Sequence, residues 1–222
     1  MRRLLPPRLS GLGNPYHVAL TFDDGPDTAT TPYFLDALEA LQVRATFFVL
    51  GSRVARLPGL TREIVAAGHE LGVHGWDHRC VAWSSPRAAA GGVHRTRNLI
   101  IETTGQVPRW YRPAYGVASF PALWAAAGVG LTPVLWTDWG RDWIKDATAD
   151  SVAMVATANL KGRAVLLLHD APAGNAHPGG WQATLEALPL IVARCRVRAL
   201  EVGPLSEHGL PLHGRGQLRA PT

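Results

Sequence analysis

The residues best suited to chemistry are two adjacent carboxylates, Asp23 and Asp24, which follow an apolar segment and precede a Gly-Pro turn. Alternation along residues 17–22 predicts a buried strand that ends at these acids. Neighbouring carboxylates repel each other, so a folded protein that keeps both needs a compensating charge. A metal ion bound by one of them would supply that charge and leave the other to act as a base. Taken alone, the tetrapeptide could equally be a solvated turn.

Two histidines, His74 and His78, stand four residues apart and could bind one ion if their segment forms a helical turn. With Asp24 they make a His, His, carboxylate set, which is typical of catalytic zinc sites and leaves room for water and substrate. The same ligands suit non-haem iron, so residue type leaves the metal open. Arg112 and His169 add two further polar side chains at the ends of predicted strands.

Alternating strands and helices must position these residues. Predicted strands cover residues 17–22, 45–50, 70–73, 110–112, 130–135, 164–168 and 198–202, and predicted helices cover 31–41, 60–67, 85–104, 119–127, 148–160 and 181–195. Continuous apolar strands are typical of a parallel sheet covered by helices, which indicates an α/β barrel or a doubly wound sheet. In both folds ligands bind at the carboxyl ends of the strands, where the polar residues above fall.

Composition limits what the chain can be. With 222 residues, 47% of them hydrophobic, it can bury one substantial core. The net charge of +5 comes from scattered arginines, which argues against a nucleic-acid groove and is compatible with an anionic polymer. Cys80 and Cys195 are too few and too far apart in the sequence for a disulfide scaffold or a cysteine zinc site. No segment approaches the roughly 20 apolar residues that a transmembrane helix needs.

The two ends differ from the rest. Pro6, Pro7 and Arg8 interrupt the apolar run at the amino terminus, so residues 1–14 predict an extension and not a signal peptide. Residues 203–222 are rich in Gly, Pro, Arg and His and predict a mobile tail. As the chain stands we expect a cytoplasmic monomer, or a secreted or cell-wall-associated protein if a targeting segment precedes it.

Five motifs follow one another along the chain. They are Thr21-Phe22-Asp23-Asp24-Gly25-Pro26, His74 to His78, Arg112-Pro113-Ala114-Tyr115-Gly116, Asp142-Trp143 and Leu167-Leu168-His169-Asp170. In this order they resemble the motifs of the polysaccharide deacetylases of carbohydrate esterase family 4. The resemblance covers residues 15–202, which would be the catalytic domain. It implies a distorted, incomplete (β/α) barrel of about seven parallel strands.

The resemblance also implies a metal centre. Asp24, His74 and His78 would bind a divalent ion, with Zn²⁺ favoured and Co²⁺, Mn²⁺ or Fe²⁺ as alternatives. Asp23 would be the general base that activates water, and Arg112 would hold it ionised and oriented through a charge-assisted pair.

The remaining motif residues would complete the site. His169 would be the general acid that protonates the leaving amine, tuned by Asp142. Tyr115 would donate its backbone N–H to the developing oxyanion. Trp143 and Leu167 would form the walls of a small apolar pocket for the acetyl methyl group.

Some positions stand apart from the motifs. Gly75 occupies a position where the family usually has Ser or Thr, whose hydroxyl braces the metal-ligand loop. Trp136, Trp139 and Trp143 crowd one loop and could either stack on sugar faces or cover the barrel mouth. His177 lies on a predicted loop near the mouth, where it could contact substrate or be an ordinary loop histidine.

The resemblance predicts a metal-dependent hydrolase that removes acetyl from N-acetylglucosamine units of a polymer or oligosaccharide. Peptidoglycan and chitin-like substrates are the first candidates. An O-acetyl xylan esterase, a hydrolase of small amides or cyclic imides, and a non-catalytic carbohydrate-binding protein are the alternatives. Asp23 and His169 argue against the last of these, because a binding protein needs neither a base nor an acid.

Overall fold

Strands and helices alternate along nearly all of residues 7–80, 85–174 and 176–212, the parts of the chain that the computed structural model describes. The strands are β1 (His17–Asp23), β2 (Thr46–Val49), β3 (Glu70–Val73), β4 (Trp110–Tyr111), β5 (Thr132–Pro133), β6 (Asp138–Trp139), β7 (Ala164–His169) and β8 (Glu201–Gly203). The helices are α1 (Pro7–Ser10), α2 (Thr31–Leu41), α3 (Gly51–Arg56), α4 (Pro58–Ala66), α5 (Pro86–Thr104), α6 (Phe120–Gly128), α7 (Ala149–Thr157) and α8 (Gly180–Val197), with short 3₁₀ helices η3 (Ala114–Gly116) and η4 (Leu205–Glu207).

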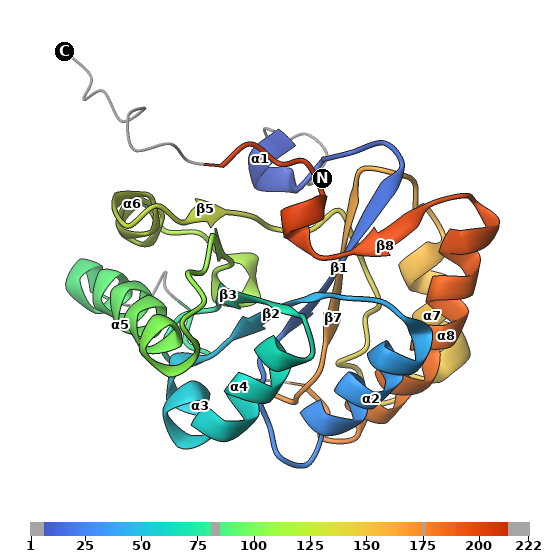
Figure 1. The fold of residues 1–222 in the computed structure, drawn as a ribbon, viewed down its shortest axis with the longest axis horizontal. Coiled ribbons are helices and arrows are strands. Elements are labelled where there is room, and N and C mark those ends of the chain that lie inside the picture. Colours follow the sequence, from blue (N-terminus) through green and yellow to red (C-terminus); the bar gives the residue numbers. More distant parts are fainter. Residues whose placement is uncertain (1–6, 81–84, 175, 213–222) are drawn as a thin grey trace.

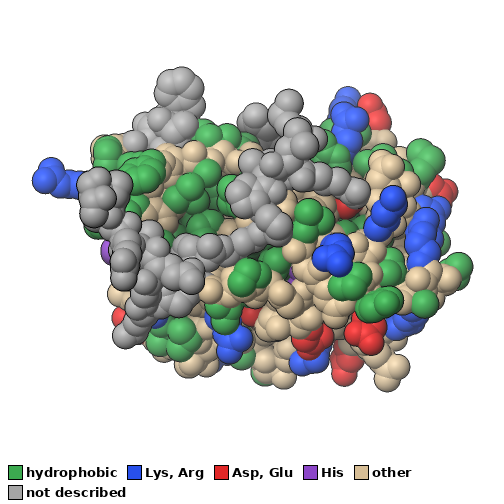
Figure 2. Space-filling view, turned by 90° about the horizontal axis from the view of Figure 1, so that it is seen from above, with side chains coloured by type: hydrophobic (Ala, Val, Ile, Leu, Met, Phe, Trp, Pro, Cys, Tyr) green, Lys and Arg blue, Asp and Glu red, His purple; other side chains and the backbone are tan. Residues whose placement is uncertain are grey.

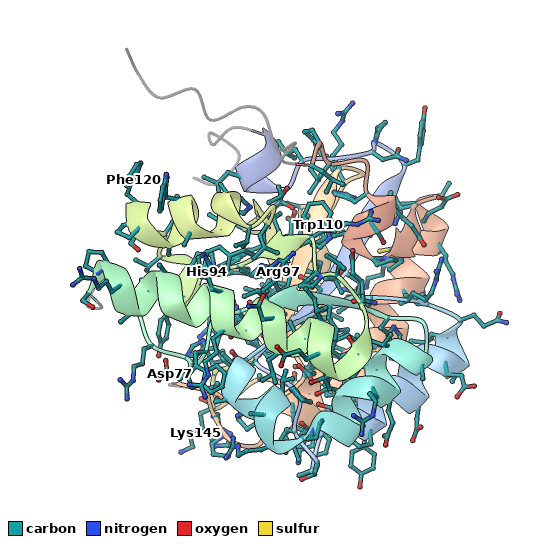
Figure 3. All side chains as sticks on the ribbon, turned by 60° about the vertical axis from the view of Figure 1, so that its left-hand side comes forward. Asp77, His94, Arg97, Trp110, Phe120 and Lys145 are labelled. Atoms are coloured by element: carbon teal, nitrogen blue, oxygen red, sulfur yellow. The ribbon has the colours of Figure 1, made fainter. Side chains whose placement is uncertain are left out.

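The strands form one parallel sheet in the order β5-β4-β3-β2-β1-β7-β6, and β8 pairs with the start of β1. The sheet curls into a half-barrel with helices around it (Figure 1). Helices α2, α7 and α8 cover one side of the molecule, and α5 and α6 cover the other (Figure 1). Figure 3 shows α5 and α6 side by side, with Phe120 at the start of α6. The predicted incomplete (β/α) barrel of about seven parallel strands is confirmed.

The centre of the sheet is β1, because β2 pairs on one side of it and β7 on the other. The register sets Asp23 beside Phe48 of β2 and beside His169 of β7. Since all paired strands run parallel, their carboxyl ends meet at one rim of the half-barrel. The acids of β1 and the histidine of β7 therefore lie on the same rim.

Side chains of β1 alternate between two apolar clusters, as successive residues of a strand must. Val18, Leu20 and Phe22 pack in the larger cluster, between the sheet and the helices. Ala19 packs in the smaller one, which fills the inside of the half-barrel together with Phe48, Trp110, Val165 and Leu167. Thr21 and Asp23 share the inner face with Ala19, which directs the functional end of β1 into the barrel mouth.

Several elements differ from the sequence-based expectation. The predicted strand over residues 130–135 shortens to β5, and β6 forms inside the tryptophan-rich loop, where no strand was predicted. Helix α3 was also missed, since its six residues are too few to show an apolar period. Residues 203–212 were expected to be part of a mobile tail, but Leu205, His208 and Leu210 are buried. Local composition gives no sign of this packing, because the partners are far away in the sequence.

The surface carries charge of both signs. On the face shown in Figure 2, Lys and Arg side chains are spread among Asp, Glu and apolar side chains and do not form one strip. Among the described residues, no helix is both long and apolar enough to cross a membrane.

A buried histidine pair ties the two ends of the described chain together. The Nδ1 atoms of His17 and His208 lie 2.9 Å apart, and Nε2 of His208 donates to the carbonyl of Gly11 at 2.9 Å. Burial lowers the pKa of each imidazole to about 4. For His208 the neighbouring His17 adds to this lowering of the pKa. Both rings are therefore neutral at neutral pH in the folded protein.

We expect the free energy of unfolding to fall as the pH drops from about 6.5 towards 4. In this window the unfolded chain binds protons at the two histidines and the folded protein does not, so acid favours unfolding, by roughly 1–2 kcal/mol per histidine at pH 5. Urea unfolding at pH 7.5 and pH 5 measures the difference. In His208→Gln, which cannot be protonated there, the difference should be smaller. An unchanged difference in this variant would show that the pair is not responsible.

Candidate active site

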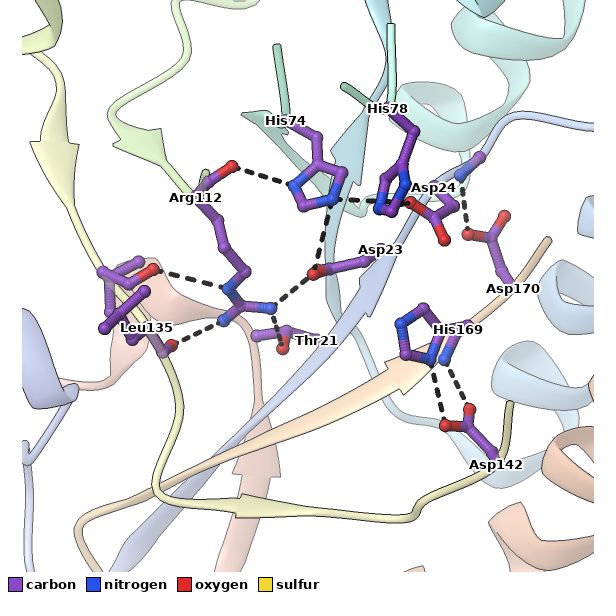
Figure 4. A network of polar contacts seen from close by, with 12 residues as sticks. Thr21, Asp23, Asp24, His74, His78, Arg112, Leu135, Asp142, His169 and Asp170 are labelled. Carbon is purple, nitrogen blue, oxygen red and sulfur yellow. Dashed lines mark hydrogen bonds and ion pairs between the residues drawn. The ribbon is translucent and has the colours of Figure 1, made fainter. Parts of the chain in front are cut away.

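A cavity of about 250 Å³ opens at the carboxyl ends of the strands. It is lined by acids, imidazoles, aromatic rings and small residues from several elements: Asp23, Asp24, His74, His78, Tyr115, Gly116, Trp136, Trp139, Trp143, Leu167, His169, Ala173 and Ala176. Its polar groups gather around the end of β1 (Figure 4).

The chain turns sharply where β1 ends. Asp24 has a left-handed φ of 87°, and its N–H donates to the carbonyl of Phe48 at 3.1 Å. The N–H of Gly25 donates to Oδ1 of Asp170 at 3.2 Å, and the hydroxyl of Thr31 donates to the other oxygen at 2.6 Å. A Cβ at position 25 would lie 2.3 Å from the Asp170 carboxylate, so only glycine fits there. The turn is thus held from β2 and from the end of β7.

Asp24, His74 and His78 converge on one point, with their ligand atoms all within 4.8 Å of one another. Oδ1 of Asp24 lies 3.4 Å from Nε2 of His74 and 3.3 Å from Nε2 of His78. This buried oxygen accepts no hydrogen bond from the described residues. A carboxylate oxygen and two imidazole nitrogens that face each other in this way fit a divalent cation.

The two histidines are held differently. Nδ1 of His74 donates to the carbonyl of Arg112 at 2.9 Å, which fixes the tautomer with Nε2 free to bind a metal. Nδ1 of His78 is buried and has no hydrogen-bond partner among the described residues, and its ring packs against Tyr115 with centroids 4.4 Å apart. The segment between them is a loop with bends and not the helical turn considered from the sequence.

Arg112 lies fully buried beneath the site. Its guanidinium donates to Oδ1 of Asp23 at 2.7 Å and to the Thr21 hydroxyl at 2.8 Å. It also donates to the carbonyls of Leu135, at 2.9 Å, and Val134, at 3.4 Å. Asp23 is thereby held in place by a charge-assisted hydrogen bond to a buried cation.

His169 is held by Asp142 in a second pair (Figure 4). Its Nδ1 lies 2.9 Å from Oδ1 of Asp142, and its backbone N–H donates to Oδ2 of the same carboxylate at 2.7 Å. The Thr184 hydroxyl of α8 donates to Oδ2 as well, at 2.9 Å. This arrangement leaves Nε2 as the ring nitrogen that can face the cavity.

Burial and neighbouring charges shift the pKa values of His169, Asp24 and His78 in different directions. Burial disfavours the charged form of His169, but Asp142 and the nearby Asp24 and Asp23 outweigh it and raise its pKa to about 10. Burial likewise opposes ionisation of Asp24, yet the surrounding histidines lower its pKa to about 2. Burial lowers the pKa of His78. At neutral pH the site therefore combines an ionised carboxylate for a metal with a protonated imidazole.

The loop after β4 and the tryptophans of the 136–143 segment form the rest of the cavity. Tyr115 has a left-handed φ of 58° in η3, an unusual backbone conformation that often marks functional sites. The rings of Trp139 and Trp143 are 5.2 Å apart, and that of Trp143 is 5.6 Å from His169. Leu167 of β7 lies at the cavity floor and is buried.

All ten residues that the sequence singled out meet at this rim. Eight of them line the cavity, whereas Arg112 and Asp142 lie behind it and hold Asp23 and His169. The sequence reasoning placed Asp170 in a motif without a role of its own and gave no role in the site to Thr31 or Thr184, although these residues support the turn and the acid. Asp170 could have been found, because it follows His169 at a strand end. His177 is exposed, and its N–H donates to the carbonyl of Trp143.

Residues 12–134 match the family model for polysaccharide deacetylase. A chitooligosaccharide deacetylase of Bradyrhizobium sp. (strain ANU 289) is 34% identical over 196 residues, which cover 86% of this chain and 89% of the relative. A peptidoglycan-N-acetylglucosamine deacetylase of Listeria monocytogenes is 37% identical over 153 residues, covering 69% of this chain and 32% of the relative. The chain thus spans about a third of the Listeria protein's length.

The fold is likewise found among solved structures. The crystal structure of a peptidoglycan N-acetylglucosamine deacetylase, in complex with 4-naphthalen-1-yl-N-oxidanyl-benzamide, superposes with a TM-score of 0.82 and 30% identity over 90% of this chain and 91% of that chain. The motif order, the half-barrel and the family match agree. The chain belongs to the polysaccharide deacetylase family.

Proposed function

We propose that this protein is a metal-dependent hydrolase that removes the acetyl group from N-acetylglucosamine units of a polymer or oligosaccharide. The observation that carries the proposal is the pairing of two differently charged groups at one metal-binding cluster. Asp23 is held by the buried Arg112, and His169 is held protonated by Asp142. A base and an acid that share one small cavity are what amide hydrolysis requires.

Asp24, His74 and His78 would hold the ion, for which Zn²⁺ is the first candidate. When bound, such an ion makes water more acidic and polarises the acetyl carbonyl. Asp23 accepts the proton of the attacking water, and its hydrogen bond from Arg112 holds it at the edge of the cavity.

His169 donates a proton to the nitrogen as the bond between nitrogen and the acetyl carbon breaks. The amide and one water molecule thus give acetate and a free amine on the sugar. The backbone N–H of Tyr115 would stabilise the negative charge that develops on the carbonyl oxygen. Trp143 and Leu167, which line the apolar part of the cavity, would receive the acetyl methyl group.

The substrate class is supported by the relatives and by the cavity. The relatives named above act on peptidoglycan and on chitooligosaccharides by name, and both contain N-acetylglucosamine. At the cavity, Trp139 is 41% exposed and could stack on a neighbouring sugar ring.

We expect the zinc-loaded protein to release acetate from N-acetylglucosamine oligomers faster than from acetylated xylan. Acetate assays with both substrates, before and after removal of the metal by a chelator, measure this preference. Activity should disappear with the metal and return when zinc is added. No acetate from either substrate, with bound metal confirmed by elemental analysis, would contradict the proposed function.

Replacing each adjacent carboxylate should separate their roles. Asp23→Asn should keep bound metal but lower kcat by at least about 100-fold, because the base is lost. Asp24→Ala should lose the metal itself, since it removes one of three ligands. Metal content and acetate release, measured on the same samples, distinguish the two. Full metal occupancy in Asp24→Ala would show that this division of roles is wrong.

Asp142→Asn should shift the basic limb of the pH profile of kcat/KM to lower pH. The Asp142 carboxylate raises the pKa of His169, and the reaction needs His169 protonated, so without that charge the proton is lost at a lower pH. Thr184→Val removes only a hydrogen bond to the same carboxylate and serves as the control, with a smaller shift expected. A basic limb that stays in place in Asp142→Asn would assign the limb to another group.

A further inference from the structure

The loop that joins the metal ligands His74 and His78 has no side chain at its first position. Gly75 has φ of 102°, a conformation that L side chains rarely adopt, and a Cβ there would meet only the Asp77 carbonyl, at 3.9 Å. The loop therefore cannot be held by a hydroxyl from position 75. Its fixed geometry must come from neighbouring elements.

Helix α5 and the start of α3 hold the backbone of this loop. The hydroxyl of Thr96, on α5, donates to the carbonyl of Gly75 at 2.9 Å. The N–H of Gly51 donates to the same carbonyl at 3.0 Å, and the N–H of Ser52 donates to the carbonyl of Trp76 at 2.8 Å. Both peptide groups that follow Gly75 and Trp76 are thus fixed by donors outside the loop.

Trp76, in the middle of the loop, is clamped against α5. The guanidinium of Arg95 lies 3.4 Å from the ring centroid of the indole, a stacked cation–π contact. Gly51 makes room for this ring, whereas a Cβ at Gly92 would be at ordinary contact distance from the Cβ and backbone N of Trp76. A Cβ at Gly51 would lie 2.6 Å from the indole and 2.3 Å from the Thr96 hydroxyl, and one at Gly92 would lie 3.5 Å from Trp76. Figure 3 shows α5 beside Asp77, the next residue of the loop.

His78 depends on this support more than His74 does. The His74 ring is fixed by its hydrogen bond to Arg112, and the backbone N–H of His74 donates to Val49 at 3.0 Å. The ring of His78 has no such hydrogen bond from the described residues, so its position depends on its packing against Tyr115 and on the backbone before it. A loop that could shift would move Nε2 of His78 away from Asp24.

We propose that Thr96 and Arg95 of α5 are positioning residues for the metal ligand His78, acting through the Gly75 carbonyl and the Trp76 ring. This inference rests on the metal-dependent function proposed above. Partners that orient metal ligands typically change metal affinity by 10- to 100-fold when they are removed. We expect the buried hydroxyl of Thr96 to lie at the low end of that range and the exposed cation of Arg95 to lie below it.

The test compares variants of nearly the same shape. Thr96→Val keeps the size of the side chain and removes the hydroxyl, and we expect about tenfold weaker zinc binding in competition with a chromogenic chelator. Thr96→Ser keeps the hydroxyl and should bind zinc as the unmodified protein does. Arg95→Ala, at an exposed position, should weaken zinc binding about threefold. The visible absorption of the Co²⁺-loaded protein should change in Thr96→Val and stay unchanged in Thr96→Ser.

A second threonine of α5 provides the matched control. The hydroxyl of Thr104 donates to the carbonyl of Ile100 at 2.7 Å and accepts from the N–H of Gln106 at 3.1 Å, and neither bond involves residues 74–78. Thr104→Val should therefore leave zinc affinity and the Co²⁺ spectrum unchanged, even if it lowers the free energy of unfolding in chelator as much as Thr96→Val does.

Three results would overturn the inference. These are zinc affinity in Thr96→Val equal to that of the unmodified protein, equal losses in Thr96→Ser and Thr96→Val, and an equal loss in Thr104→Val. If the unmodified protein binds no metal, the proposed function itself fails and the inference fails with it. Measuring metal binding by the unmodified protein therefore distinguishes a failure of the proposed function from a failure of the inference about Thr96 and Arg95 alone.

Discussion

The buried ion pair between Arg112 and Asp23 is the interaction on which the site depends. Burying a charged group away from water costs free energy unless the group is paired and its hydrogen bonds are satisfied. Here the guanidinium has a carboxylate, a hydroxyl and two carbonyls as acceptors, and the ring of Phe48 lies 4.0 Å from its central carbon. These four acceptors take four of the five N–H groups of the guanidinium, and loss of any one leaves the buried cation short of a partner. The position of Asp23 is fixed by this requirement.

The same residue links Asp23, the proposed base, to His74, a proposed metal ligand. The side chain of Arg112 reaches β1 through Thr21 and Asp23, and its backbone carbonyl accepts the hydrogen bond that orients His74. Its contacts with the carbonyls at positions 134 and 135 join the strand pair β4 and β5 to the centre of the barrel. A half-barrel has no closed ring of strands to fix the relative positions of its two sides. In this protein one buried side chain joins the β4–β5 side of the sheet to its central strand β1.

Local sequence patterns predicted an α/β fold with polar residues at the strand ends, and the resemblance to the deacetylase motifs implied the half-barrel and the remaining site residues. Buried parallel strands are largely apolar, as residues 164–168 of β7 are, and polar residues at their ends stand out. What remained hidden depends on contacts between distant segments. Nothing near His208 in the sequence indicates its bond to His17, and nothing near Thr96 indicates its bond to Gly75. The two-residue extents of β5 and β6 could not be predicted for a related reason, because these strands are defined by pairing with their neighbours.

One backbone torsion, the positive φ of Asp24, allows the adjacent carboxylates of Asp23 and Asp24 to face the same cavity. Adjacent residues of a regular strand point to opposite faces, so two consecutive carboxylates would not normally serve one cavity. At Asp24 the positive φ of 87° ends the strand and brings the second carboxylate back to the mouth, beside His74 and His78. Such a conformation costs about 1–3 kcal/mol and persists only where its surroundings enforce it. The hydrogen bonds from Asp24 to Phe48 and from Gly25 to Asp170 supply that constraint. The family's two acids can thus share one cavity because the strand ends between them.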